Sequence, residues 1–145
     1  MTEVEETQQD IPAQITDLVI PQESIDEYGH VNYKEIPSLL EPAQDQYMNE
    51  RGIGFKSLQD NLGIRSFVKA NSSVFKQQLL LGDNLTVETK IGHIGNTSFS
   101  FNQQILKKGE TAVEYSLTVV CVDEDGIPIS LSRDLKERLH LRFNN

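Results

Sequence analysis

The feature that most constrains the fold of this 145-residue chain is a single change in hydrophobic period. From residue 33 to 51, apolar side chains recur every three or four positions, which is the spacing of one helix face. After residue 64 the pattern alternates between apolar and polar side chains, which is typical of half-buried strands. The alternating runs are separated by glycine-containing turns at 94–96 and 107–110. One early helix followed by hairpin-connected strands predicts an α+β protein with an antiparallel sheet covering the helix.

The pattern also predicts the individual elements. We expect strands at 15–21, 64–77, 85–91, 97–105 and 111–122, which make a sheet of about five strands, and a further helical turn at 55–61. Pro37 falls in the first turn of the helix, where its missing N–H costs nothing. Pro42 falls in the interior, so we expect a kink or a break into two short helices there. Ser132 is the expected N-cap of a short C-terminal helix.

The chain is expected to form one domain, from residue 13 to 145, after a disordered acidic tail at 1–12. Phe55, Leu58, Phe67 and Phe75 are interpreted as core side chains rather than as pocket lining. A single sheet wrapped on one helix leaves strand edges unprotected, and pairing two sheets in a symmetric dimer would cover them.

The segment Asp26-Glu27-Tyr28-Gly29-His30-Val31-Asn32-Tyr33 stands between the first strand and the helix. A helix N-terminus leaves backbone N–H groups without intrahelical partners, and it favours negative charge or a polarised carbonyl oxygen. A carboxylate facing that end is suited to acyl chemistry. Spacing alone leaves a second interpretation open, in which Asp26 and Asn32 are turn and cap residues.

The pattern Asp-x-x-Gly-His-Val-Asn-Tyr at 26–33 resembles that of the 4-hydroxybenzoyl-CoA thioesterase family, which has the hotdog fold. The run from Phe75 to Leu85, with its Gly82-Asp83 turn, resembles a second signature of that family. The resemblance extends from about Ile15 to Leu139. It implies an α+β hotdog fold, a homodimer or homotetramer, and hydrolysis of acyl-CoA or acyl-ACP thioesters.

The resemblance also implies roles for three motif residues. Asp26 would attack the thioester carbonyl or deprotonate a water that attacks it. The main-chain N–H of Tyr33 would polarise the thioester oxygen. His30 would orient Asp26 or the substrate, and a structural histidine is the equally open alternative.

Three further residues are candidates for substrate contacts. Gly29 would let the backbone approach the substrate closely, or it serves only a tight turn. Asn32 is interpreted chiefly as a cap. Glu41 is the second candidate carboxylate, because some hotdog thioesterases place theirs on the helix, although a solvent-facing Glu is the ordinary outcome. The alternative function is a non-catalytic hotdog module that binds an acyl ligand or serves in assembly.

Composition limits the partners and the location. A net charge of −9 argues against nucleic acid, which needs clustered Lys and Arg. No apolar run approaches the ~18 residues that span a bilayer. The N-terminus lacks the order of a secretory signal, so a cytoplasmic location is expected. The single Cys121 lies in an apolar run and is expected to be buried.

No cofactor or metal is expected from the sequence. His30, His93 and His140 stand apart from Cys or carboxylate residues at any metal-ligand spacing. The chain has no Gly-x-Ser-x-Gly elbow and no glycine-rich loop of the dinucleotide or P-loop type. The carboxylate of the motif is therefore the remaining candidate for chemistry.

Overall fold

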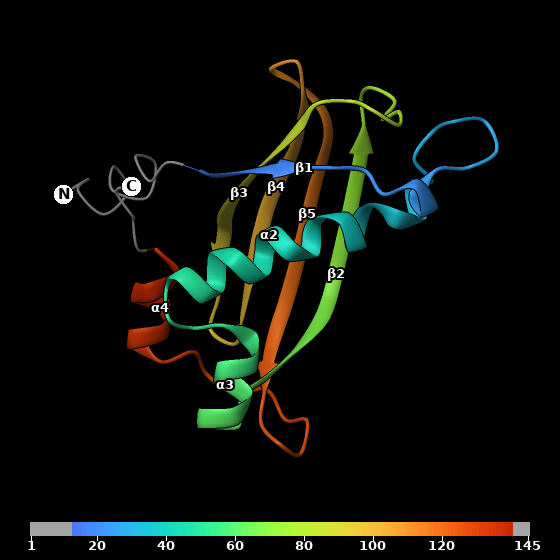
Figure 1. The fold of residues 1–145 in the computed structure, drawn as a ribbon. Coiled ribbons are helices and arrows are strands. Elements are labelled where there is room, and N and C mark those ends of the chain that lie inside the picture. The colour runs from blue at the N-terminus through green and yellow to red at the C-terminus, as the bar shows by residue number, and fades with distance from the viewer. Residues whose placement is uncertain (1–12, 141–145) are drawn as a thin grey trace.

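The five strands form one antiparallel sheet in the order β1-β3-β4-β5-β2 (Figure 1). The computed structural model describes residues 13–140; the predicted tail at 1–12 lies outside the described residues, as does 141–145. The strands are β1 (Gln14–Leu18), β2 (Arg65–Phe75), β3 (Leu85–Ile94), β4 (Ser98–Lys107) and β5 (Glu110–Val122). All five predicted strands are present, with ends that differ by a few residues.

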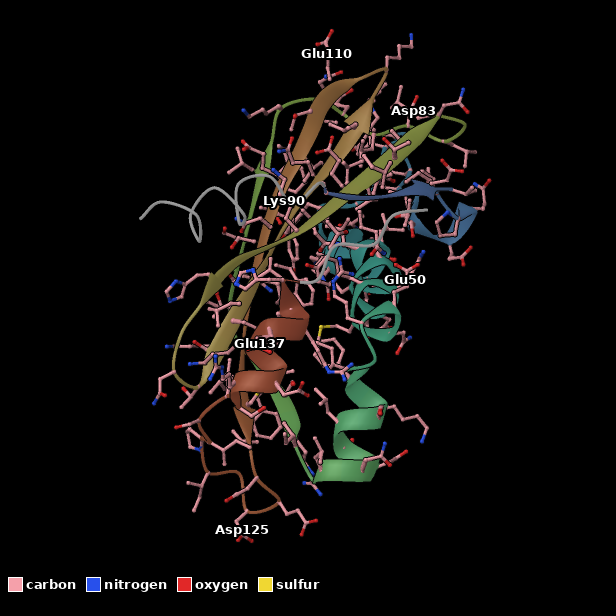
Figure 2. The ribbon with its side chains drawn as sticks, turned by 90° about the vertical axis from the view of Figure 1, so that its left-hand side faces the viewer. Glu50, Asp83, Lys90, Glu110, Asp125 and Glu137 are labelled. Carbon is pink, nitrogen blue, oxygen red and sulfur yellow. The ribbon has the colours of Figure 1, made fainter. Side chains whose placement is uncertain are left out.

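The helices cover one face of this sheet (Figure 2). The long helix α2 (Ile36–Glu50) crosses the sheet, and two shorter helices, α3 (Phe55–Leu62) and α4 (Arg133–Leu139), follow at one end (Figure 1). Two 3₁₀ turns, η1 (Gln22–Ser24) and η2 (Tyr33–Glu35), precede α2. The Ser132 hydroxyl accepts a hydrogen bond from the Leu135 N–H at 3.1 Å, which confirms the predicted N-cap. This arrangement confirms the expected hotdog fold.

The alternation along β4 places large side chains against the helix. Phe99, Phe101 and Ile105 are fully buried, and they meet the buried face of α2. Tyr47 of α2 packs edge-on against Phe101, with ring centroids 6.1 Å apart. Burial of each such side chain contributes about 1.5–3 kcal/mol, so this contact holds the helix across the sheet.

One polar network crosses the same interface. Gln103 of β4 is buried, and its Nε2 donates to Leu40 O at 3.3 Å and to Thr89 Oγ1 at 3.1 Å. Its Oε1 accepts a hydrogen bond from Gln44 Nε2 at 2.8 Å. Both groups of the Gln103 amide are thereby paired, as a buried amide requires.

Of the kink or break expected at Pro42, the break into two short helices is wrong. Helix α2 runs as one element through Pro42. Both Pro42 and Ser38, the residue whose carbonyl loses its helical partner, lie on the exposed side of the helix. Water can therefore solvate that carbonyl, and the buried face offsets the cost of about 3 kcal/mol that an interior proline carries.

Strand β2 is the exposed edge of the sheet. It pairs with β5 along one side, and all its residues except Ser66 are exposed. The core interpretation of Phe67 and Phe75 is therefore wrong, because both are about half exposed on this edge. Leu58 is buried as expected. Among residues 13–140, no helix is long and apolar enough to cross a membrane.

Candidate active site

A cavity of about 530 Å³ lies where the 26–33 motif meets the start of α2 and the end of β2. We call it the motif cavity. Three segments build its wall: the motif loop, the first residue of α2, and the chain that leaves β2. The lining residues are Asp26, His30, Val31, Asn32, Tyr33, Ile36, Phe75, Lys76, Gln77, Gln78 and Leu79.

The motif loop is a small hairpin closed by an antiparallel bridge between Ile25 and Val31. The Asp26 N–H donates to His30 O at 2.8 Å, and the Gly29 N–H donates to Asp26 O at 3.1 Å. Gly29 has a φ of 83°, a left-handed conformation that other residues adopt at a cost. Gly29 therefore closes the turn and does not itself line the cavity.

The Asp26 carboxylate uses its two oxygens differently. Oδ1 accepts hydrogen bonds from the backbone N–H groups of Tyr28 at 2.9 Å and His30 at 3.1 Å. Within residues 13–140, no donor is bonded to Oδ2. Asp26 is thus a turn residue, as the second interpretation expected, and it also lines the motif cavity.

The entry to α2 leaves one backbone donor unused. The Asn32 side-chain oxygen accepts from the Lys34 N–H at 3.0 Å, and Asn32 O accepts from the Glu35 N–H at 2.9 Å. Asn32 is therefore the cap of η2. In the described part of the chain, no group accepts a hydrogen bond from the Tyr33 N–H, and Tyr33 lines the cavity. The donor required for a polarised carbonyl oxygen is present and unpaired.

His30 contributes to the site through its backbone. Its N–H donates to the Asp26 carboxylate, and His30 is one of the residues that line the motif cavity. No hydrogen bond to the imidazole occurs among residues 13–140. Of the roles left open for His30, a contact with Asp26 is present, and it is made by the main-chain N–H.

Glu41 lies in another place. It lines a second cavity of about 620 Å³ beside α2, which we call the helix-side cavity. Asp45, one helical turn further, shares that cavity, and partial burial together with the Glu41 charge raises the pKa of Asp45 above its ordinary value. Phe55, Arg65 and Phe67 also line it. The structure thus separates Glu41 from the motif cavity.

The sequence did not indicate the cavity wall that follows β2. Lys76, Gln77, Gln78 and Leu79 complete the motif cavity, and the Lys76 ammonium lies 3.0 Å from the Glu114 carboxylate. The available signal was the position of these residues inside the second family signature. Their side chains have no period of their own, so pattern analysis could not assign them.

No group of three or more His, Cys, Asp or Glu side chains in the described residues could hold a metal ion. The ionisable side chains among the residues that line the motif cavity are those of Asp26, His30, Tyr33 and Lys76.

Comparison with known proteins shows the superfamily and the fold. A family model described as the Thioesterase-like superfamily matches residues 19–139. No curated protein sequence matches the chain significantly.

Several solved structures share the fold. A DHNA-CoA thioesterase from Staphylococcus aureus is 23% identical, with a TM-score of 0.79 over 86% of this chain and 87% of its own. A 1,4-dihydroxy-2-naphthoyl-CoA thioesterase from Synechocystis is 12% identical, with a TM-score of 0.78 over 86% and 93%. A thioesterase from Thermus thermophilus, solved with coenzyme A and Zn, is 22% identical, with a TM-score of 0.76 over 89% and 92%. At these identities the likeness establishes the fold.

Proposed function

The chain belongs to the thioesterase-like superfamily, and we propose that it hydrolyses acyl-CoA or acyl-ACP thioesters with Asp26 as the reacting carboxylate. One observation carries the proposal. The free Oδ2 side of the Asp26 carboxylate and the unpaired Tyr33 N–H belong to residues that line the same cavity at the start of α2. A thioester carbonyl in that cavity would meet an anionic oxygen and a fixed hydrogen-bond donor.

Two routes use these groups. In one, Oδ2 attacks the carbonyl carbon and the C–S bond breaks, so that the thiolate departs. The acyl group is then bound to Asp26 as a mixed anhydride, which water hydrolyses. In the other, Oδ2 takes a proton from a water whose oxygen attacks the carbonyl carbon. The C–S bond then breaks, the leaving thiolate takes up that proton, and the free acid and the thiol are released. In both, negative charge develops on the carbonyl oxygen, where the Tyr33 N–H and the helix N-terminus stabilise it.

The other motif residues have supporting roles in the proposal. The His30 imidazole lines the cavity and contacts the substrate, while its N–H holds Oδ1. Gly29 closes the turn that presents Asp26, and Asn32 fixes the entry to the helix beside the substrate. Glu41 is retained as the alternative carboxylate, acting from the helix-side cavity.

Within the superfamily we assign the chain to the 4-hydroxybenzoyl-CoA type. The support is the placement of the carboxylate in the loop before the helix, in the Asp-x-x-Gly-His-Val-Asn-Tyr pattern. Two of the three structural relatives above are named as thioesterases of 1,4-dihydroxy-2-naphthoyl-CoA (DHNA-CoA), so aromatic acyl-CoA thioesters are the first substrates to test.

The proposal includes assembly into a homodimer or homotetramer. Strand β2 is an edge of 11 residues that exposes Phe67, Val68, Val74 and Phe75. Antiparallel pairing of β2 with a second copy would cover this edge and bring the motif loop near the partner's strands. Light scattering should report at least twice the 16.4 kDa of one chain, and Val68→Glu should shift the protein toward monomer. A monomer at micromolar concentration would contradict this part.

We also expect a cytoplasmic location. Cys121 is free and fully buried, which suits a compartment in which thiols stay reduced.

The test is thiol release from a panel of thioesters. The panel contains 4-hydroxybenzoyl-CoA, 1,4-dihydroxy-2-naphthoyl-CoA, straight-chain acyl-CoA and acyl-ACP. We expect turnover of at least one member, and we expect Asp26→Asn to lower that turnover by roughly two to four orders of magnitude. Tight binding of a thioester without thiol release would instead support the alternative, a non-catalytic acyl-binding or assembly module.

A further inference from the structure

Part of the wall of the motif cavity is formed by a connecting segment that lies outside the strands. Residues 76–84 connect β2 to β3 without belonging to either strand. Gln78 and Leu79 of this segment line the cavity. The motif loop pairs with it: the Val31 N–H donates to Leu79 O at 2.9 Å, and His30 forms an antiparallel bridge with Leu80. The position of the loop that carries Asp26 therefore depends on the position of residues 78–80.

Asp83 and Lys107 hold this segment. Asp83 Oδ2 accepts hydrogen bonds from the Leu80 N–H at 2.8 Å and from Lys107 Nζ at 3.0 Å. Lys107 Nζ also donates to Gln78 O at 3.1 Å. One carboxylate and one ammonium thus fix two backbone groups on either side of Leu79.

This ion pair differs from the others in the described residues. The side chains of Asp83 and Lys107 are 17% and 18% exposed, whereas those of the other four pairs are 42% to 93% exposed. Charges shielded from water interact more strongly and are screened less by salt. Partial burial alone would raise the pKa of Asp83, but the Leu80 N–H and the Lys107 ammonium lower it overall, so the carboxylate stays ionised.

We propose that Asp83 and Lys107 are positioning residues for Asp26. They hold the backbone of residues 78–80, against which residues 30–31 of the motif loop pair, and so they set the orientation of the turn that presents Oδ2. Neither residue lines the motif cavity. Figure 2 shows Asp83 at the end of the sheet opposite Asp125. The inference rests on the proposed role of Asp26, and it explains the Gly82-Asp83 turn as part of the site as well as the start of β3.

The alternative hypothesis, in which the ion pair is only structural, predicts a different result. If Asp83 and Lys107 only stabilise the β3–β4 end of the sheet, their loss lowers the melting temperature and leaves the motif loop and the turnover of the folded protein unchanged. If they position the loop, their loss accelerates hydrogen exchange at the Val31 N–H and lowers kcat, while the amides in β4 keep their protection from exchange.

The experiment compares Asp83→Asn, Lys107→Met, the double variant, and Asp60→Asn. The control removes the exposed carboxylate of the Lys56–Asp60 pair, which has a 2.7 Å separation on α3. Native-state amide exchange should accelerate at Val31 by about tenfold, the change that about 1.4 kcal/mol produces and roughly the value of one charge-assisted hydrogen bond. Asp60→Asn should leave Val31 unchanged. Lys107→Arg keeps the cation and should restore most of the protection.

Kinetics provide the second measurement. Asp83→Asn and Lys107→Met should each lower kcat by about tenfold with little change in KM, and the double variant should lose less than the product because the two residues act on one segment. Unchanged Val31 exchange in either variant would overturn the inference, even with a lower melting temperature. Absence of thiol release by the wild-type chain would overturn the proposed function instead, and Val31 exchange would still decide whether the pair holds the loop.

Discussion

The two cavities beside α2 both contain carboxylates, but their surroundings differ. The motif cavity lies at the start of the helix, where the Tyr33 N–H is unpaired and one oxygen of Asp26 is already fixed by backbone donors. The helix-side cavity lies along the helix body, where Glu41 and Asp45 stand one turn apart. The Asp26 carboxylate in the motif cavity accepts hydrogen bonds from two backbone N–H groups, whereas Glu41 and Asp45 in the helix-side cavity are like charges one helical turn apart.

The like charges in the helix-side cavity affect the pKa of Asp45. Partial burial and the charge of Glu41 raise it, because both disfavour the ionised form. The two cavities differ in the donors around the carboxylate, and these donors are the basis on which we propose an acyl-transfer role for Asp26 and not for Glu41. The presence of a carboxylate on a cavity wall is not sufficient for that proposal.

The largest expected effect comes from a matched pair of variants, one in each cavity, which tests whether Asp26 or Glu41 is the reacting carboxylate. Asp26→Asn should lower turnover by roughly two to four orders of magnitude, since a lost general base costs about that much. Glu41→Gln should change turnover by less than tenfold. Both are measured by thiol release on one active thioester, with binding measured separately. The reverse ranking would move the reacting carboxylate to the helix-side cavity.

The second prediction removes the backbone donor itself. Tyr33→Pro deletes the N–H, and Asn32 already has the extended conformation (φ −66°, ψ 129°) that a following proline requires. Turnover should fall by about two to three orders of magnitude, as for other oxyanion donors. Tyr33→Ala keeps the N–H and should have a mild effect, as should Tyr33→Phe. Equal losses in Pro and Ala variants would show that the side chain is what matters.

The third prediction concerns the turn. An added Cβ at Gly29 meets no atom within 4 Å, so Gly29→Ala is strained only by the φ of 83°. That strain of about 1–2 kcal/mol should depopulate the turn and lower kcat by about tenfold. Gly29→Asn tolerates this conformation and should recover most of the activity. Unaltered kinetics for Gly29→Ala would separate the turn from the chemistry.

The smallest effect is expected from Asp45. A raised pKa in the folded state means that the ionised form destabilises the fold above the ordinary pKa, and that this penalty is relieved as pH falls. Asp45→Asn should therefore be neutral or stabilising at pH 7, by less than about 0.5 kcal/mol at this exposed position. The difference should vanish near pH 3. Urea unfolding at both pH values measures it, and a clear destabilisation at pH 7 would contradict the electrostatic account.

Much of the fold was accessible to sequence analysis. The alternation in β3 and β4 and the helical spacing of α2 depend on neighbours a few residues away, so they could be predicted without knowledge of the sheet order. The predicted break at Pro42 was wrong, because whether a helix tolerates an interior proline depends on which of its sides faces water. The prediction that Phe67 and Phe75 are core side chains was wrong for a related reason, since only the sheet order makes β2 an edge strand.

The sequence by itself determined the local devices: the Asp26–Gly29 turn, the Asn32 and Ser132 caps, and the elements between them. Hydrogen bonds that span two to four residues need only the chain that carries them. The tertiary structure alone decided that Asp26 and Tyr33 line one cavity with residues 75–79, and that Asp83 meets Lys107. These contacts join segments far apart in the chain, so they exist only after the buried faces of helix and sheet have packed together.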